Sequence, residues 1–165
     1  MKPLTEHDIR TSFVNCSKGE AKRLPLPKNL ADLDHWDDLD FLGWFDLSAP
    51  DRKYLVAERA GELVGLSLRS ASGNRGFLRR SLCSLCLTTH PGNGVALMTA
   101  AKAGPAGRAG NSVGRYICAD LDCSLYTRGT KKAVPGGRME ESLTIEQQIE
   151  RLRRNLDAFL ERVLH

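Results

Sequence analysis

The stretches SLCSLC (residues 81–86) and CADLDC (residues 118–123) hold four of the five cysteines of this 165-residue chain. The first pair is spaced C-x2-C and the second C-x4-C, with 31 residues between them. A redox dithiol needs only one such pair, so it explains half of the pattern. Unrelated buried cysteines are an alternative, because a free thiol packs as a small apolar group. A tetrahedral zinc site explains both pairs. Its ligands would be Cys83, Cys86, Cys118 and Cys123.

The residues around the two pairs predict a treble-clef zinc finger. VALMTA (residues 95–100) and SVGRYIC (residues 112–118) read as two strands of a β-hairpin between the pairs. The second pair comes where the latter strand meets a helix predicted over residues 119–126, and a helix N-terminus favours negatively charged thiolates. Four sulfurs would leave the ion no open position, so the zinc is predicted to be structural.

The remaining cysteine and the histidines are weaker candidates for metal ligands. Cys16 lies far from the other four in sequence and is predicted to be a packing residue. His90 follows Cys86 by four residues and is the candidate substitute ligand, although a supporting or surface position is the more usual one. The other histidines have no ligand spacing; they are His7, His35 and His165.

The first third of the chain predicts short helical segments on a core. Thr5 is a candidate N-cap for a helix over residues 4–13, which would end before an extended stretch over residues 17–27. The acidic stretch 30–44 has apolar residues at mostly three-residue intervals and holds both tryptophans, which predicts helical turns packed on a core. Its five aspartates, whose spacing does not match a calcium loop, are interpreted as a solvated helix face. They are Asp32, Asp34, Asp37, Asp38 and Asp40.

The rest of the chain predicts a sheet and a long C-terminal helix. Residues 53–59 and 62–69 alternate around Ala60-Gly61 and read as a hairpin. Thr144 and Gln147 form a capping box that opens the helix. Its apolar face would be Ile145, Ile149, Leu152, Leu156, Phe159 and Val163. Segments 70–80 and 127–138, and a glycine-rich stretch over 104–111, are predicted to be loops. The prediction is one α+β domain over residues 1–165: an antiparallel sheet with a treble-clef finger, N-terminal helical segments and a long C-terminal helix.

Composition and charge narrow the function. The start lacks a signal-peptide core and no run approaches a membrane helix, so we expect a cytoplasmic protein without membrane contact. A reducing compartment favours a metal over disulfides. No Gly-rich phosphate loop with its lysine, GxSxG or HExxH motif occurs, so no enzyme is predicted. The segment 73–138 has two acidic and ten basic residues, which attract phosphate or an acidic protein unless they only solubilise. The ten are Arg75, Arg79, Arg80, Lys102, Arg108, Arg115, Arg128, Lys131, Lys132 and Arg138.

Five stretches together resemble a known family. They are FVNCSKGEAKRLPLP, LDFLGW, CSLCLTTHPGNGVALM, GRAGNSVGRYICADLDCSLYTRG and ESLTIEQQIERLRRNL. This pattern resembles the FBP, or elongation-factor-G-binding, C-terminal domain and is similar to the zinc-finger domain of FusB-type fusidic acid resistance proteins. The resemblance covers residues 13–163 and implies a treble-clef domain with the four paired cysteines as ligands. FusB-type proteins also carry an N-terminal helical bundle, for which this chain has no expected counterpart.

The resemblance implies that the domain binds elongation factor G and promotes its release from the ribosome, which is how FusB-type proteins act against fusidic acid. Residues near the metal would form one rigid basic-aromatic surface for the factor or for ribosomal RNA. The candidate contacts are Thr89, His90, Lys102, Arg108, Arg115 and Tyr116. The other open reading is a basic zinc-finger protein that binds RNA or DNA without factor specificity, although few aromatic residues accompany the basic ones. We expect a monomer.

Overall fold

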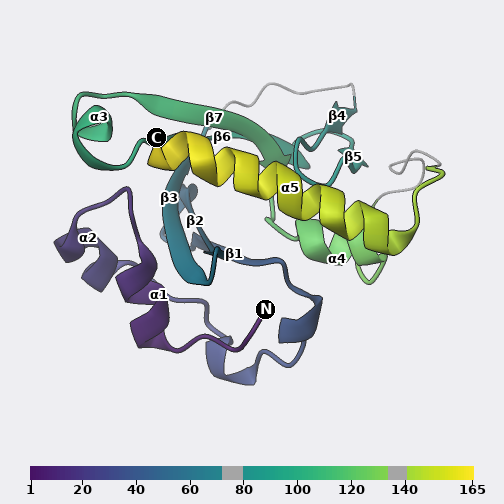
Figure 1. Cartoon of the computed structure of the whole chain (residues 1–165), viewed down its shortest axis with the longest axis horizontal. Coiled ribbons are helices and arrows are strands. Elements are labelled where there is room, and N and C mark those ends of the chain that lie inside the picture. Colours follow the sequence, from purple (N-terminus) through teal and green to yellow (C-terminus); the bar gives the residue numbers. More distant parts are fainter. Residues whose placement is uncertain (72–79, 134–140) are drawn as a thin grey trace.

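A computed structural model describes residues 1–71, 80–133 and 141–165 of the chain (Figure 1). Its centre is a five-stranded antiparallel sheet with the strand order β1-β2-β3-β6-β7. The strands are β1 (Phe41–Asp46), β2 (Ala49–Arg59), β3 (Glu62–Ser70), β6 (Val95–Ala101) and β7 (Ser112–Cys118). Two further short strands, β4 (Ser81–Leu82) and β5 (Thr89–His90), pair with each other. The predicted α+β class with an antiparallel sheet is confirmed.

One face of the sheet, here called the α5 face, is covered by the C-terminal helix α5 (Ile145–Leu164), which crosses the strands in Figure 1. The helix buries Leu152, Leu156, Phe159, Leu160 and Val163 in a core shared with the strands and with the four paired cysteines. The predicted capping box of Thr144 and Gln147 is present. Ile145 is the exception on the predicted apolar face: it is exposed, because it lies in the first turn beyond the edge of the core.

The opposite face, here called the α1 face, is covered by the N-terminal segments. They are α1 (Glu6–Ser12), α2 (Lys18–Arg23) and the 3₁₀ turns η1 (Leu30–Asp32) and η2 (Trp36–Asp38). Their apolar side chains form a second core with β1 and β2 around Trp36, Trp44 and Tyr54. Both tryptophans are therefore packing residues, as predicted.

The N-terminal third also contains two errors of prediction. The stretch predicted to be extended holds helix α2, which Ser17 and Glu20 open with a capping box that overrides Gly19. The predicted helical turns stop at Asp38, and Phe41–Asp46 is strand β1 instead, because its residues pair with β2 and bury alternate side chains. The helix at the N-terminus, capped by Thr5 with Asp8, is confirmed.

The second half follows the predicted hairpin, with differences at its ends. Strands β6 and β7 pair from Val95–Cys118 to Ala101–Ser112, so the predicted ligand Cys118 marks one end of the hairpin. The loop predicted at the other end holds a short helix, α3 (Gly104–Arg108), begun by Pro105. Helix α4 (Cys123–Arg128) begins at the last cysteine rather than at Ala119. The loop predicted over 70–80 begins one residue too early, because Ser70 ends β3; most of that loop, and part of the one predicted over 127–138, lies outside the described residues.

The α1 and α2 helices cover only part of their face. Alternation along the strands puts Leu97, Thr99 and Tyr116 on the α1 face, beyond the reach of the N-terminal core. Tyr116 is 51% exposed, and Gly114 between these residues is exposed as well. The β6–β7 half of the α1 face is therefore open to solvent.

Candidate metal centre

The first cysteine pair lies in the tight turn between β4 and β5. Cys83 N–H donates to the Thr88 carbonyl over 2.9 Å, and Leu87 N–H donates to the Cys83 carbonyl over 3.0 Å. Leu87 adopts a left-handed conformation with φ 58°, which closes the turn. The Leu85 N–H lies 3.4 Å from the Cys83 sulfur. The backbone therefore turns both sulfurs inward and directs an amide toward one of them.

The second pair lies where β7 ends and α4 begins. Cys118 is the last residue of the strand and Cys123 the first residue of the helix. Leu121 bridges them with φ 65° and donates its N–H to the Cys118 carbonyl over 2.9 Å. Leu121 packs against β1 at Gly43, where an added Cβ would lie 2.4 Å from the Leu121 Cβ. Glycine at this position lets the loop of the second pair press directly on the sheet.

The four sulfurs form one buried cluster. Cys83 and Cys123 approach to 3.7 Å and Cys86 and Cys118 to 3.5 Å, and all four ligand atoms lie within 4.8 Å of one another. A tetrahedral ion with Zn–S bonds of about 2.3 Å separates its sulfurs by about 3.8 Å, whereas a disulfide bond is only about 2.05 Å long. The geometry fits one structural zinc ion. Among the described residues this is the one cluster of metal-ligating side chains.

The pKa values of the cysteines show that the four thiols cannot all ionise unless a cation lies between them. Hydrogen bonds from the thiols of Cys118, Cys123 and Cys86 hold the pKa of Cys83 well below its ordinary value. Burial, reinforced by the neighbouring sulfurs, raises the pKa of Cys123 far above its ordinary value. Four thiolates cannot share this volume without a positive charge at its centre, and a divalent ion supplies it.

A family comparison agrees with this geometry. A family model described as the FBP C-terminal treble-clef zinc-finger matches residues 8–163. The chain belongs to this family. No functionally curated protein matches the sequence.

The FBP domain also resembles a solved structure, that of the fusidic acid resistance protein FusC. The TM-score is 0.54 at 19% sequence identity, and the match covers 86% of this chain and 52% of the FusC chain. At this identity the match shows a shared fold. The FBP domain spans about half the length of that relative.

His90 supports the metal centre of the FBP domain from outside the four sulfurs. Its Nε2 lies 3.3 Å from the Cys118 sulfur, and its ring packs edge-on against Tyr126 with 4.7 Å between ring centroids. The backbone at Gly94 approaches so closely that an added Cβ would lie 2.4 Å from the His90 Cβ. His90 is 5% exposed, so it orients a ligand sulfur, which is the supporting position considered for it above.

Lys53 supplies positive charge near the metal centre, and sequence reasoning missed it. A zinc ion with four thiolates has a net charge of −2. The Lys53 side chain projects from β2 on the α5 side of the sheet. Its Nζ donates to the Ala119 carbonyl, next to Cys118, over 2.6 Å. Burial lowers the pKa of Lys53. Its place in an alternating strand, on the same side as Leu55, was the available signal of an inward-facing lysine.

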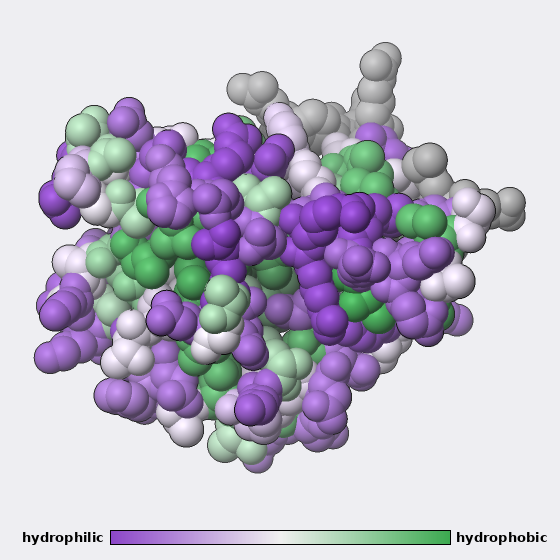
Figure 2. Space-filling view, in the orientation of Figure 1, coloured by the Kyte–Doolittle hydropathy of each residue, from purple (hydrophilic) through white to green (hydrophobic). Residues whose placement is uncertain are grey.

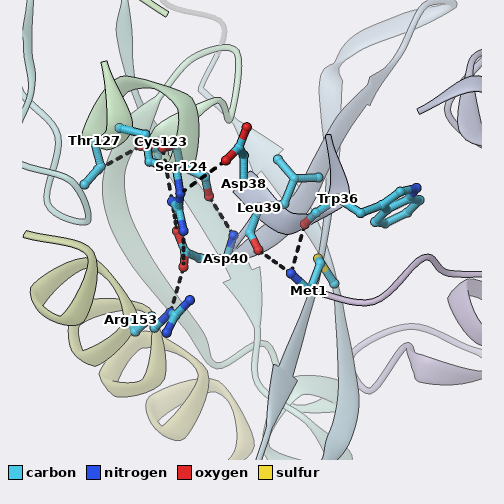
Figure 3. A network of polar contacts seen from close by, with 10 residues as sticks. Met1, Trp36, Asp38, Leu39, Asp40, Cys123, Ser124, Thr127 and Arg153 are labelled. Atoms are coloured by element: carbon cyan, nitrogen blue, oxygen red, sulfur yellow. Dashed lines mark hydrogen bonds and ion pairs between the residues drawn. The ribbon is translucent and has the colours of Figure 1, made fainter. Parts of the chain in front are cut away.

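Asp40 joins the metal helix to the rest of the domain, which corrects its interpretation as part of a solvated face. Its side chain is fully buried and accepts hydrogen bonds from Arg128 Nη1 over 2.6 Å and Arg153 Nε over 2.7 Å (Figure 3). Its N–H donates to Ser124 Oγ over 2.9 Å. Arg128 and Ser124 belong to α4 and Arg153 to α5. Asp40, the residue before β1, therefore connects this part of the chain with helix α4 and with the C-terminal helix.

The structure separates the six predicted partner contacts instead of gathering them on one surface. Thr89 lies in the strand pair that flanks the first cysteine turn, directly opposite Leu82, and Tyr116 is exposed on the α1 face. Arg115, the next residue of the strand, points to the opposite face, with Met98 as its neighbour. A single surface holding both side chains is thus ruled out by strand alternation.

The last two predicted contacts lie far from the cysteines. Lys102 follows the end of β6 and Arg108 ends α3, whereas the metal ligand Cys118 is at the other end of the hairpin. Both line a pocket that also contains Cys16, a half-buried residue packed on the second core. The predicted packing role of Cys16 is confirmed.

Proposed function

We propose that this FBP domain is a non-enzymatic zinc module that binds elongation factor G, free or on the ribosome, and so modulates translation. Membership of the FBP family and the fold shared with a fusidic acid resistance protein support the proposal. The main support for a non-enzymatic module is the closed four-cysteine centre. A zinc ion with four protein ligands has no position for substrate or water, so we infer that it holds a binding surface rigid.

The surface proposed for the factor is the Tyr116 patch, defined as Leu82, Thr89, Leu97 and Tyr116. Leu97 and Tyr116 are direct neighbours across the β6–β7 pair, and Leu82 and Thr89 are direct neighbours in the β4–β5 pair. The Ser84 N–H, in the first cysteine turn, donates to the Tyr116 carbonyl over 2.7 Å and ties the two pairs together. Leu82 and Tyr116 are exposed apolar side chains held by the metal centre.

Such a patch has the chemistry of a protein-binding site. Tyrosine is enriched among the residues that dominate binding energy, since it buries a large rigid surface with little loss of conformational entropy. No charged side chain belongs to the patch. Basic residues at the far end of the hairpin would then add long-range attraction to an acidic factor without direct contact.

Titration calorimetry with purified elongation factor G tests this proposal. Wild-type protein is expected to bind with a dissociation constant in the micromolar range or below, and Tyr116→Ala to weaken binding at least about tenfold. Phe45→Ala is the matched control, because Phe45 is an aromatic residue of similar exposure on β1, at the opposite edge of the sheet. We expect this control to bind as wild type.

Two results would reject the proposal. One is absence of binding by wild-type protein at micromolar concentration, and the other is an equal loss in both variants. A second assay follows the release of the factor from ribosomes in the presence of fusidic acid, where Tyr116→Ala should again be the impaired variant.

The proposed setting is the cytoplasm, with the domain acting as a monomer. No helix in the described part of the chain is both long and apolar enough to cross a membrane. Light scattering after size exclusion checks the monomer, which should have the mass of one 18.2 kDa chain.

A further inference from the structure

A groove runs along the α1 face, apart from the metal and the Tyr116 patch. Two pockets, of about 250 and 340 Å³, share Cys16 and Glu20 as lining residues and so adjoin. The first is lined by α2, β2 and β3, and the second by the chain after α1, the end of β6 and α3. Figure 1 shows α2 and α3 on the same side of the molecule, and Figure 2 shows the surface indented between them.

Basic side chains outnumber acidic ones in the lining of the groove. Two acidic residues are present, Glu20 and Asp46; each is hydrogen-bonded to a nearby serine, and both also attract the charge of Arg52. Glu20 accepts the Ser17 N–H over 2.8 Å, and Asp46 accepts the Ser48 N–H over 2.8 Å. Against them stand five cations: Arg23, Arg52, Arg69, Lys102 and Arg108. Arg69 pairs with Asp51 at 3.2 Å, while the other four form no ion pair within the described residues.

Two of these arginines lie where the repulsion between their like charges should destabilise the sheet. Arg52 and Arg69 are directly opposite in the β2–β3 register, so both side chains project from the same face at neighbouring positions. Like charges directly opposite on antiparallel strands destabilise a sheet. A local rule broken in this way, inside a concavity, is typical of a binding site for the opposite charge.

The type of cation indicates the ligand. Four of the five are arginines, whose planar guanidinium forms paired hydrogen bonds to phosphate oxygens. Tyr54, the aromatic residue lining the groove, is buried and offers no face for a base to stack on. We propose that this groove binds the phosphodiester backbone of a single-stranded nucleic acid, independently of base sequence. This activity goes beyond factor binding, and its contact residues lie outside the Tyr116 patch.

Fluorescence anisotropy with a labelled twelve-nucleotide single-stranded RNA tests the groove on the full zinc-loaded chain. Each phosphate contact contributes about 0.7 to the salt slope of single-strand binding. Arg52→Ala/Arg69→Ala should therefore weaken binding about 25-fold at 0.1 M salt and reduce the slope by about 1.4. The matched control is Arg154→Ala/Arg162→Ala, which removes the same charge from exposed positions of α5. Its binding should stay within about threefold of wild type.

Thermal melting accompanies each variant. The groove variant should melt at the wild-type temperature or above, since it relieves the opposed charges. If it fails to fold, Arg52→Gln/Arg69→Gln replaces it with the same expected loss of RNA binding.

Three further ligands distinguish a nucleic acid backbone from an acidic protein or a small phosphate compound as the occupant of the groove. Single-stranded DNA of the same sequence should bind comparably, which supports backbone recognition. Displacement of RNA by polyglutamate of equal charge, or by low millimolar inorganic phosphate, would overturn the assignment in favour of an acidic protein or a small phosphate compound. No RNA binding by wild type at micromolar concentration, or equal losses in both double variants, would also overturn it. Elongation factor G binding should be unchanged in the groove variant, which keeps the two proposals independent.

Discussion

The two cores on the two faces of the sheet are stabilised by different means. The core on the α1 face is built on aromatic contacts: Phe13 meets Trp44 and Tyr54 edge-on at 6.3 and 6.1 Å, and Trp44 lies 5.3 Å from Tyr54. The core on the α5 face contains the four paired cysteines; Cys118 ends the seven-residue strand β7, and the other three lie on or between short elements. Strands of two residues and a helix of six residues cannot persist alone. The metal region therefore depends on its ion.

The strand pairing between the two regions is narrow, and side-chain contacts such as Lys53 to Ala119 and Asp40 to Arg128 supplement it. Strands β3 and β6 pair through only two residue pairs, Arg69–Thr99 and Ser70–Met98, after which Asn15 fills the gap. By contrast, β2 and β3 pair over eight positions. We therefore expect the metal region to unfold while the aromatic core stays folded.

Metal removal is the strongest test of this difference. Chelation at neutral pH, or Cys118→Ser, should unfold the described part of residues 80–128, because the binding energy of structural zinc is folding energy. Hydrogen exchange should show amides of β6, β7 and α4 losing protection while those of β1 and β2 keep it. Both tryptophans lie in the aromatic core, so their fluorescence should change little.

Cys16→Ser is the control, since Cys16 is the cysteine outside the metal cluster. It should retain zinc and the wild-type exchange pattern. Loss of protection in all strands together after chelation would show that the two regions form one cooperative unit.

Removal of the carboxylate between the regions should have the next largest effect. Asp40→Ala leaves Arg128, whose side chain is 12% exposed, with only the longer 4.0 Å contact to Asp38, and should cost about 3 kcal/mol in the free energy of unfolding. Denaturant titration measures this loss. Ser124→Ala, which removes one hydrogen bond of the same network, should cost about 1 kcal/mol.

The Asp40 contribution has a defined pH dependence. Burial opposes ionisation, but hydrogen bonds from Arg128 and Arg153 prevail and lower the pKa of Asp40 below 3.8. A lowered native pKa stabilises the fold above the unfolded-state value, and the benefit disappears as pH falls through the native value. The difference between wild type and Asp40→Ala should stay constant from about pH 8 to 5 and shrink below about pH 4. A difference that grows on acidification would contradict the pairing.

A change inside the aromatic core should cost less than the loss of Asp40 and should not affect zinc binding. Trp44 donates its indole N–H to the Pro25 carbonyl over 2.8 Å, which Trp44→Phe removes together with part of the ring. The expected cost is about 1–2 kcal/mol, with one zinc still bound. Zinc loss in this variant would mean that the two cores are more tightly coupled than their narrow connection indicates.

Local patterns were sufficient wherever one element carries its own signal. Cysteine spacing predicted the metal cluster, and alternation around Ala60-Gly61 predicted the β2–β3 hairpin. The Thr144 capping box predicted the start of α5. In each case the pattern and the tertiary packing favour the same structure.

The predictions fail where a residue's position depends on packing against elements far away in the sequence. Asp40 reads as one more aspartate in an acidic stretch, and only the arginines of α4 and α5, far away in sequence, make its burial possible. Arg115 and Tyr116 could have been assigned to opposite faces from strand alternation alone. The groove could not have been found, since Arg23, Arg52 and Arg108 come from three separate elements.

Zinc content is the most direct test of the claim that one tetrathiolate ion organises the metal region. Elemental analysis of protein purified without added metal should return one zinc per chain for wild type and for Cys16→Ser, and close to none for Cys118→Ser. Wild-type protein that folds with well under one equivalent of metal would contradict the claim.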